Sequence, residues 1–173
     1  MSNNGWVPES AIQEERVINL RKFFEVAQLD RLENSNLIPA IACRRLSITE
    51  KSDFALIAWA QEAKIAARSI HTAHINLKEL SVQLNVIRAM TLKDPMDFCD
   101  ELCSLLAECG IASVILPHIE GSFLHGATFY DRDKIVIGLT LRGKDADKFW
   151  FSLFHEIGHV LLGHLNQNSN IDN

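Results

Sequence analysis

The feature that most constrains this chain is an apolar segment near its end, residues 149–164, with the sequence FWFSLFHEIGHVLLGH. A helix that is apolar nearly all round is normally buried. Its polar triplet, His155, Glu156 and His159, fits the pattern H-E-x-x-H, in which two histidines bind a metal ion and the glutamate acts as general base. Because a buried Glu or His without a partner is costly, the segment predicts a metal site. The alternative is a core helix that carries two histidines by chance.

Helical spacing places both histidines of this pattern on one side of the segment. Residues four apart on an α-helix lie one above the other, with Cβ atoms about 5–6 Å apart. His155 and His159 can therefore approach one zinc ion together, while Glu156 is rotated by about 100° from His155. A zinc-bound water has a pKa of about 7, so Glu156 can take its proton and deliver it to a leaving amine. The expected chemistry is metal-assisted peptide hydrolysis, and Gly158 is expected to let a strand or helix pass close to the site.

The sequence does not identify a third protein ligand, although a catalytic zinc site normally has three. The long pattern H-E-x-x-H-x-x-G-x-x-H fails, because Leu162 and Leu165 stand where its Gly and third His belong. His164 falls on roughly the opposite side of a continued helix, so we expect it to face solvent rather than bind the metal. Asp172 is the only carboxylate after the motif and lies in an Asn-rich end, so we do not expect it to be a ligand. Either the third ligand lies beyond residue 173 or the site is incomplete.

Composition and charge place the chain among soluble globular proteins. Hydrophobic residues make up 47% and charged residues 23% of the 173 residues, which suits one domain with a helical extension. No apolar run approaches the about 20 residues that span a membrane, and the first residues do not resemble a signal peptide. We therefore expect a cytoplasmic protein with no membrane contact. A net charge of −5 argues against direct binding of nucleic acid.

Two other residue pairs have spacings that a metal site can use. Cys99 and Cys103 share a helix face, and His71 and His74 lie three apart. No further ligand pair accompanies either of them. We expect reduced thiols packed as small apolar groups and a solvated connection.

Apolar periodicity predicts five helices, over about 11–28, 50–69, 76–90, 95–109 and 145–164. Asn76 can cap the third helix, Pro95 suits the first position of the fourth, and Gly110 ends it. Residues 30–48 have no regular pattern, and Pro39 breaks any long helix there.

After Gly110 the period becomes that of strands, over about 112–116, 122–130 and 134–138, with Asp131-Arg132-Asp133 as a hairpin turn. Gly126 marks a bulge or a close approach of the backbone to a neighbour, and Gly121 marks a turn. These patterns predict an α+β fold with N-terminal helices, a small three-stranded sheet and a buried helix that carries the motif. We divide the chain into a helical linker or extension (1–75) and a metallopeptidase-like domain (76–173) that is truncated at its C-terminal end.

Several segments resemble the ImmA/IrrE family of zinc metallopeptidases, namely 110–117, 125–130, 134–143 and, most specifically, 149–164. The stretches 5–8 and 21–24 resemble the linker of the subgroup that is fused to a helix-turn-helix domain, including HigA-type antitoxin regulators. The chain looks like a fragment that lacks both the helix-turn-helix domain and the downstream helix bearing the family's acidic third ligand.

The resemblance implies a zincin-like fold with His155 and His159 as metal ligands and Glu156 as the catalytic base. In such folds the strand beside the motif helix binds substrate backbone by strand addition, and residues 127–130 are the candidate edge. His125 is interpreted as an ordinary strand histidine rather than a residue of the cleft.

We therefore expect a zinc-dependent peptidase-like domain of a transcriptional or stress/mobile-element regulator, which hydrolyses a peptide bond in a repressor-type protein. The alternative is a non-catalytic regulatory or antitoxin module that uses the same fold to bind a cognate repressor or toxin and to oligomerise, for instance as a homodimer. In a third interpretation His155 and Glu156 are merely structural.

Overall fold

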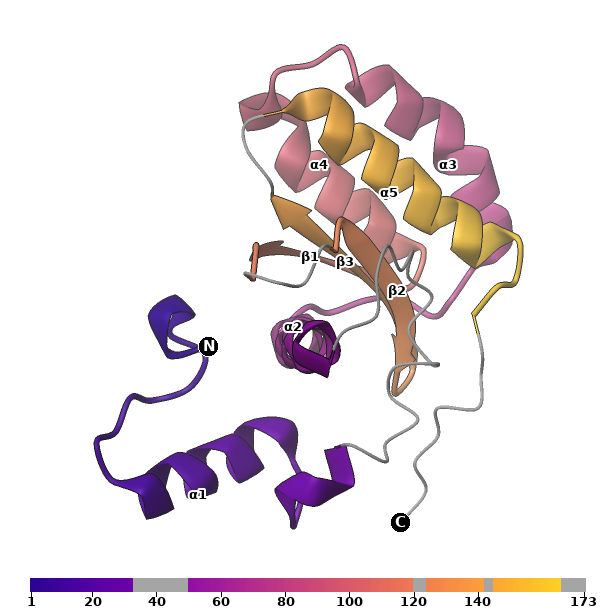
Figure 1. Cartoon of the computed structure of the whole chain (residues 1–173). Coiled ribbons are helices and arrows are strands. Elements are labelled where there is room, and N and C mark those ends of the chain that lie inside the picture. The colour runs from indigo at the N-terminus through magenta and orange to yellow at the C-terminus, as the bar shows by residue number, and fades with distance from the viewer. Residues whose placement is uncertain (33–49, 120–123, 142–144, 166–173) are drawn as a thin grey trace.

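A three-stranded sheet lies between helices that cover both of its faces (Figure 1). The computed structural model describes residues 1–32, 50–119, 124–141 and 145–165 of the chain. The helices are α1 (Gln13–Phe24), α2 (Glu50–Arg68), α3 (Leu77–Met90), α4 (Pro95–Glu108) and α5 (Ala146–Leu161), with 3-10 helices at Ser2–Asn4 and Leu29–Leu32. The strands are β1 (Ile111–Pro117), β2 (Gly126–Asp131) and β3 (Lys134–Leu141). The predicted α+β class and the predicted three-stranded sheet are confirmed.

The sheet has the order β1-β3-β2, with β3 at its centre. β1 runs parallel to β3 and β2 runs antiparallel to it. The predicted hairpin is confirmed, since Asp131 pairs with Lys134 across a turn in which Arg132 adopts a positive φ of 56°. β2 therefore forms an edge of the described sheet, and this edge contains the predicted substrate-binding segment 127–130.

Alternation of side chains along the strands divides the interior into two layers. One layer joins α3, α4 and α5 to alternate residues of the sheet, Ile111, Ile135, Ile137 and Leu139. The other layer joins α2 to the residues between them, including Ala112, Val114, Phe129 and Val136. Because both faces are covered, β1 and β3 are apolar on both sides.

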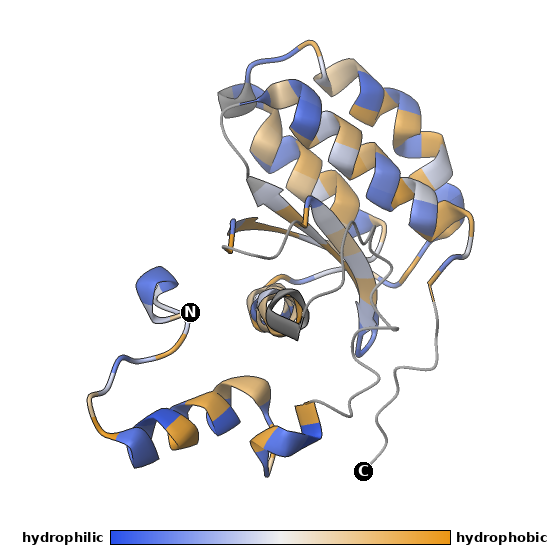
Figure 2. Cartoon of the chain, viewed as in Figure 1, coloured by the Kyte–Doolittle hydropathy of each residue, from blue (hydrophilic) through white to orange (hydrophobic). Residues whose placement is uncertain are grey.

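The N-terminal helices are attached to this core through α2. Lys134 Nζ donates to Ile70 O at 2.6 Å, just beyond the end of α2, and Arg68 pairs with both Glu25 and Asp131. A small cluster that contains Phe23 joins α1 to α2. Hydrophilic and hydrophobic residues alternate along α1 (Figure 2). The division of the chain into two parts at residue 75 stays a prediction. α2, which lies in the first of these parts, covers one face of the sheet.

Several predicted starts and ends are confirmed. Asn76 Oδ1 accepts a hydrogen bond from Glu79 N at 3.1 Å and caps α3, and α4 begins at Pro95 and ends before Gly110. Within the described ranges, no helix has the length and apolar character needed to cross a membrane.

Other boundaries were wrong. α1 ends at Phe24 instead of about 28, because Glu25 adopts a left-handed conformation with φ 56°. β2 begins at Gly126 rather than 122, so His125 precedes the strand, and α5 ends at Leu161 rather than 164. The turn predicted at Gly121 and most of the irregular segment 30–48 lie outside the described residues.

Gly110 connects α4 to β1 at a point where the link between α2 and α3 passes very close. Its φ is +83°, and a Cβ at this position would lie 2.5 Å from Ile75 Cα. We predict that Gly110→Ala lowers the free energy of unfolding by about 2–5 kcal/mol, since it adds overpacking to a strained φ. Urea unfolding measures this change.

Gly5→Ala is the matched control, because Gly5 has a φ of +73° and an added Cβ there would have no neighbouring atom within 4 Å. It should cost only about 1–2 kcal/mol, the effect of the left-handed conformation alone. Equal losses in the two variants would contradict the close contact at Gly110.

Candidate metal and catalytic site

The motif helix α5 has a buried side and an open side. Asp145 caps it by accepting a hydrogen bond from Lys148 N at 3.3 Å. Leu153 and Ile157 are fully buried, but Phe151 is 67% exposed and Leu162 is 70% exposed. The prediction of a helix buried nearly all round was therefore wrong for one side, because α5 packs on β2, β3, α3 and α4 while the side that carries Phe151 stays exposed.

The two histidines of the motif face each other. His155 Nε2 and His159 Nε2 lie 3.1 Å apart, and the ring centroids are 4.6 Å apart. Both side chains are half-buried, and burial, followed by the neighbouring His155 and His164, lowers the pKa of His159. A lowered pKa favours the neutral imidazole that binds metal. The convergence predicted from helical spacing is confirmed, and this donor pair fits two ligands of a zinc ion.

Glu156 lies on the side of α5 that packs against β2. Its side chain is only 3% exposed, and Oε2 accepts a hydrogen bond from Thr128 Oγ1 at 2.6 Å. A Cβ on Gly126 would lie 3.0 Å from Glu156 Oε1, so the close approach predicted at this glycine is confirmed. Gly126 and Thr128 are alternate residues of β2 and therefore share the face that covers the carboxyl.

Burial raises the pKa of Glu156 to about 7, while the hydrogen bond from Thr128 acts in the opposite direction. A carboxyl that titrates near neutral pH can both accept and return a proton under physiological conditions. This property suits the predicted role of general base, which stays a prediction. Thr128 was missed in the sequence, although its alternation with Gly126 on one strand was a usable signal.

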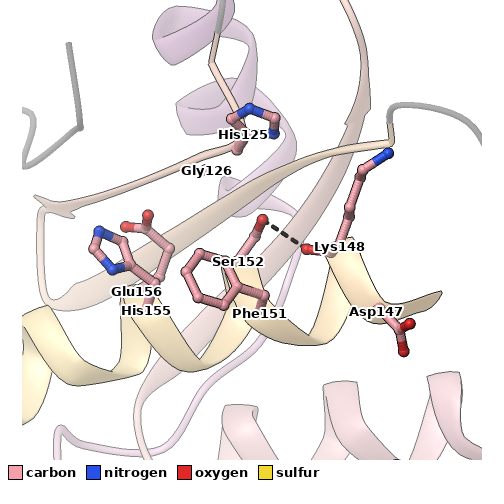
Figure 3. Close-up of a pocket in the computed structure, with 8 residues that line it drawn as sticks. All are labelled: His125, Gly126, Asp147, Lys148, Phe151, Ser152, His155 and Glu156. Carbon is pink, nitrogen blue, oxygen red and sulfur yellow. Dashed lines mark hydrogen bonds between the residues drawn. The ribbon is translucent and has the colours of Figure 1, made fainter. Parts of the chain in front are cut away.

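A pocket of about 550 Å³ opens beside the motif (Figure 3). Its lining residues are His125, Gly126, Asp147, Lys148, Phe151, Ser152, His155 and Glu156. The Phe151 ring lies nearly parallel to that of His155, with an interplanar angle of 14°, and forms an apolar wall. Ser152 Oγ donates to Lys148 O at 2.8 Å, so its hydroxyl proton is already used within the helix.

His125 was interpreted as an ordinary strand histidine, and this interpretation was wrong. It lies immediately before β2 and lines the pocket. The physical reason is the late start of the strand at Gly126, which leaves His125 on the connection that borders the cavity.

His164 was expected on the opposite side of a continued helix from the motif, and this too was wrong. The helix ends at Leu161, and the following turn brings His164 Nδ1 to 3.1 Å from His159 Nδ1. His164 is exposed, as expected.

The close approach of a strand or helix predicted at Gly158 was wrong. No atom of the described residues lies within 4 Å of a Cβ added to Gly158.

In the parts of the chain that the structure describes, no larger cluster of metal-binding residue types is present, either at the motif or elsewhere. No group of three or more His, Cys, Asp or Glu residues there could hold an ion, including around Cys99 and Cys103. The described cysteines, Cys99, Cys103 and Cys109, are free thiols. The predicted packing as small apolar groups holds for the buried Cys109 but was wrong for Cys103, which is exposed. Asp172 lies outside the described residues.

Comparisons with protein-family models, with curated proteins and with solved structures found no match to this chain. The resemblance to the ImmA/IrrE family and its zincin-like detail therefore stay predictions. The geometry of α5 and β2 has to support any functional proposal.

The buried carboxyl predicts a dependence of stability on pH in the metal-free protein. The pKa of Glu156 is about 7 in the folded chain against an ordinary value of 4.5, so the folded state binds more protons between these pH values. Stability is then fully present below about pH 4.5 and is lost as the pH rises through 7. At about 1.4 kcal/mol per pKa unit, the loss approaches about 3 kcal/mol. Urea unfolding with EDTA at pH 5 and pH 8 measures it.

Two variants isolate the contribution of Glu156. Glu156→Gln should remove this pH-dependent loss while its amide oxygen still accepts from Thr128. Thr128→Val should cost more at pH 8 than at pH 5, because the hydroxyl stabilises the ionised carboxylate. A Glu156→Gln variant with the same pH dependence as the original chain would refute the assignment.

Proposed function

We propose that this chain is a zinc-dependent peptidase-like domain that hydrolyses a peptide bond. The observation that carries the proposal is one juxtaposition. Two imidazole nitrogens lie 3.1 Å apart on α5, and the buried carboxyl between them in sequence borders the same pocket as His155. Structural histidines alone do not account for a carboxyl that is 3% exposed and accepts a hydrogen bond from the Thr128 hydroxyl beside a cavity.

Each residue of the site has a role in this proposal. His155 and His159 would hold zinc through Nε2, and bound zinc supplies a Lewis acid that acidifies water and polarises a carbonyl. Glu156 would accept a proton from a water molecule in the pocket and return it to the leaving amine. Thr128 fixes Oε2, so the other oxygen, Oε1, is the one left to exchange the proton.

The edge of the sheet supports a peptide as substrate. β2 pairs with β3 along one side only within the described sheet, so an extended peptide can add to its other side through main-chain hydrogen bonds. The pocket begins at Gly126, where β2 starts, and the Phe151 ring offers an apolar surface to a substrate side chain. By resemblance to ImmA/IrrE regulators, the substrate class is a repressor-type protein in the cytoplasm.

The second candidate function is a non-catalytic regulatory or antitoxin module that binds a cognate repressor or toxin. The observation that favours it is the ligand count, since the described residues supply two metal donors rather than the usual three. In this candidate function the sheet edge and the N-terminal helices serve binding and oligomerisation, for instance in a homodimer.

Metal analysis tests the first proposal. After reconstitution with zinc and removal of excess metal, we expect about one zinc per chain, as measured by mass spectrometry of the metal content. His155→Ala and His159→Ala should each abolish retention, because a single imidazole remains. His71→Ala, an exposed histidine on the link between α2 and α3, is the matched control and should retain the metal. A chain that retains no zinc would refute the proposal.

Glu156→Gln separates the peptidase from the non-catalytic module. This variant should retain zinc, since Glu156 is not a ligand in the proposal, but lose hydrolysis of a fluorogenic peptide library by at least about 100-fold. If it retains partner binding and regulation, and the original chain cleaves no peptide, the non-catalytic module is the correct function.

A further inference from the structure

The end of α5 folds back on itself in a defined pattern of backbone hydrogen bonds. Gly163 N donates to Val160 O at 3.2 Å, and His164 N donates to His159 O at 3.0 Å. Gly163 adopts a left-handed φ of +68°. These features define a Schellman motif, in which the residue after the left-handed glycine is bonded to the residue five positions earlier. The turn therefore fixes His164 beside His159 through the main chain.

The two side chains meet where a Schellman motif commonly has a hydrophobic contact. His164 Nδ1 lies 3.1 Å from His159 Nδ1, with ring centroids 5.4 Å apart. The next residue, Leu165, packs against the main hydrophobic core and so anchors the turned segment. The imidazole contact is thus held from both sides of His164.

Both ring nitrogens of His159 have a partner in this arrangement. Nε2 faces His155 Nε2 and Nδ1 faces His164 Nδ1, at 3.1 Å in each case. A neutral imidazole carries one N–H and one lone pair. If Nε2 of His159 gives its lone pair to a metal, its proton has to reside on Nδ1. His164 Nδ1 is then the acceptor, and the proton of His164 resides on its own Nε2.

We infer that His164 is a positioning residue that holds His159 in the tautomer and ring orientation in which Nε2 binds the metal. The inference rests on the proposed zinc site. His164 does not serve as a third ligand to the same ion, because it lies on the Nδ1 side of His159 and the metal pair lies on the Nε2 side. Histidines that bind metals generally donate their second N–H to such an acceptor, and its loss typically weakens binding about 10–100-fold.

Zinc affinity, measured by competition with a chromophoric chelator, tests the inference without any activity assay. His164→Ala should weaken zinc binding by about 10–100-fold. His164→Asn should restore most of the affinity, because the side-chain oxygen of Asn occupies nearly the place of Nδ1 and accepts the same hydrogen bond. His74→Ala, an exposed histidine outside the site, is the matched control.

A spectroscopic measurement separates positioning from a structural role. In the zinc-loaded chain, ¹⁵N NMR of the His159 ring should show the proton on Nδ1, and in His164→Ala this proton should exchange faster with water. Urea unfolding of the metal-free His164→Ala and His164→Asn variants should give the same midpoint as the original chain. This result would show that the end of the helix is intact in both variants.

The possible outcomes distinguish this inference from the proposed function. If His164→Ala binds zinc as tightly as the original chain, the positioning role is refuted and the zinc site stands. If His164→Ala weakens zinc binding but His164→Asn does not restore it, the role of His164 as a hydrogen-bond acceptor for His159 is refuted. If the original chain binds no zinc, the proposed function and this inference are both refuted.

Discussion

The burial of one carboxyl group between α5 and β2 is the constraint on which the site depends. Glu156 can lie there because Gly126 has no side chain and because Thr128 donates a hydrogen bond to the carboxyl. A larger residue at position 126 would press on the carboxyl, and an apolar residue at 128 would leave Oε2 without this donor. The same packing turns His155 and His159 toward the side of α5 that the sheet leaves open. Placement of the carboxyl thus also sets where the two imidazoles point.

The sheet holds β2 in that position through the hairpin with β3. Apolar residues on both faces of β3 fix it between α2 and the layer of α4 and α5. The register of the hairpin places Gly126 opposite Leu139 and Thr128 opposite Ile137, so both face the α5 side. A slip of one residue would turn Gly126 and Thr128 away from Glu156. The chemistry of the site therefore depends on the register of a hairpin whose turn lies at the far end of the strand.

Much of this fold follows from local sequence patterns, and the rest depends on tertiary contacts. Periodicity is a property of each segment, so it correctly predicted the sheet, the cap at Asn76 and the pairing of His155 with His159. The alternation of Thr128 with Gly126 marked a shared strand face, but periodicity alone could not show that this face meets Glu156, because that contact joins residues 28 apart. The end of α5 was missed because the apolar pattern continues past Leu161, whereas the helix ends there and Gly163 adopts a positive φ that turns the chain back. That one misplaced boundary concealed the contact between His164 and His159.

The geometry around His159 also limits how the proposed metal site can be completed. Its Nδ1 faces His164, so its Nε2 is the nitrogen directed at the shared ligand position beside His155. On one side this position is bounded by β2 and the buried Glu156, while Leu153 and Ile157 are buried in the core on the opposite side of α5. Any further donor to the ion has to approach over the open face of the helix, where the exposed Phe151 and Leu162 flank the two histidines. Phe151 and His155 also line the pocket, so the group that completes the site would also shape the space left for a substrate.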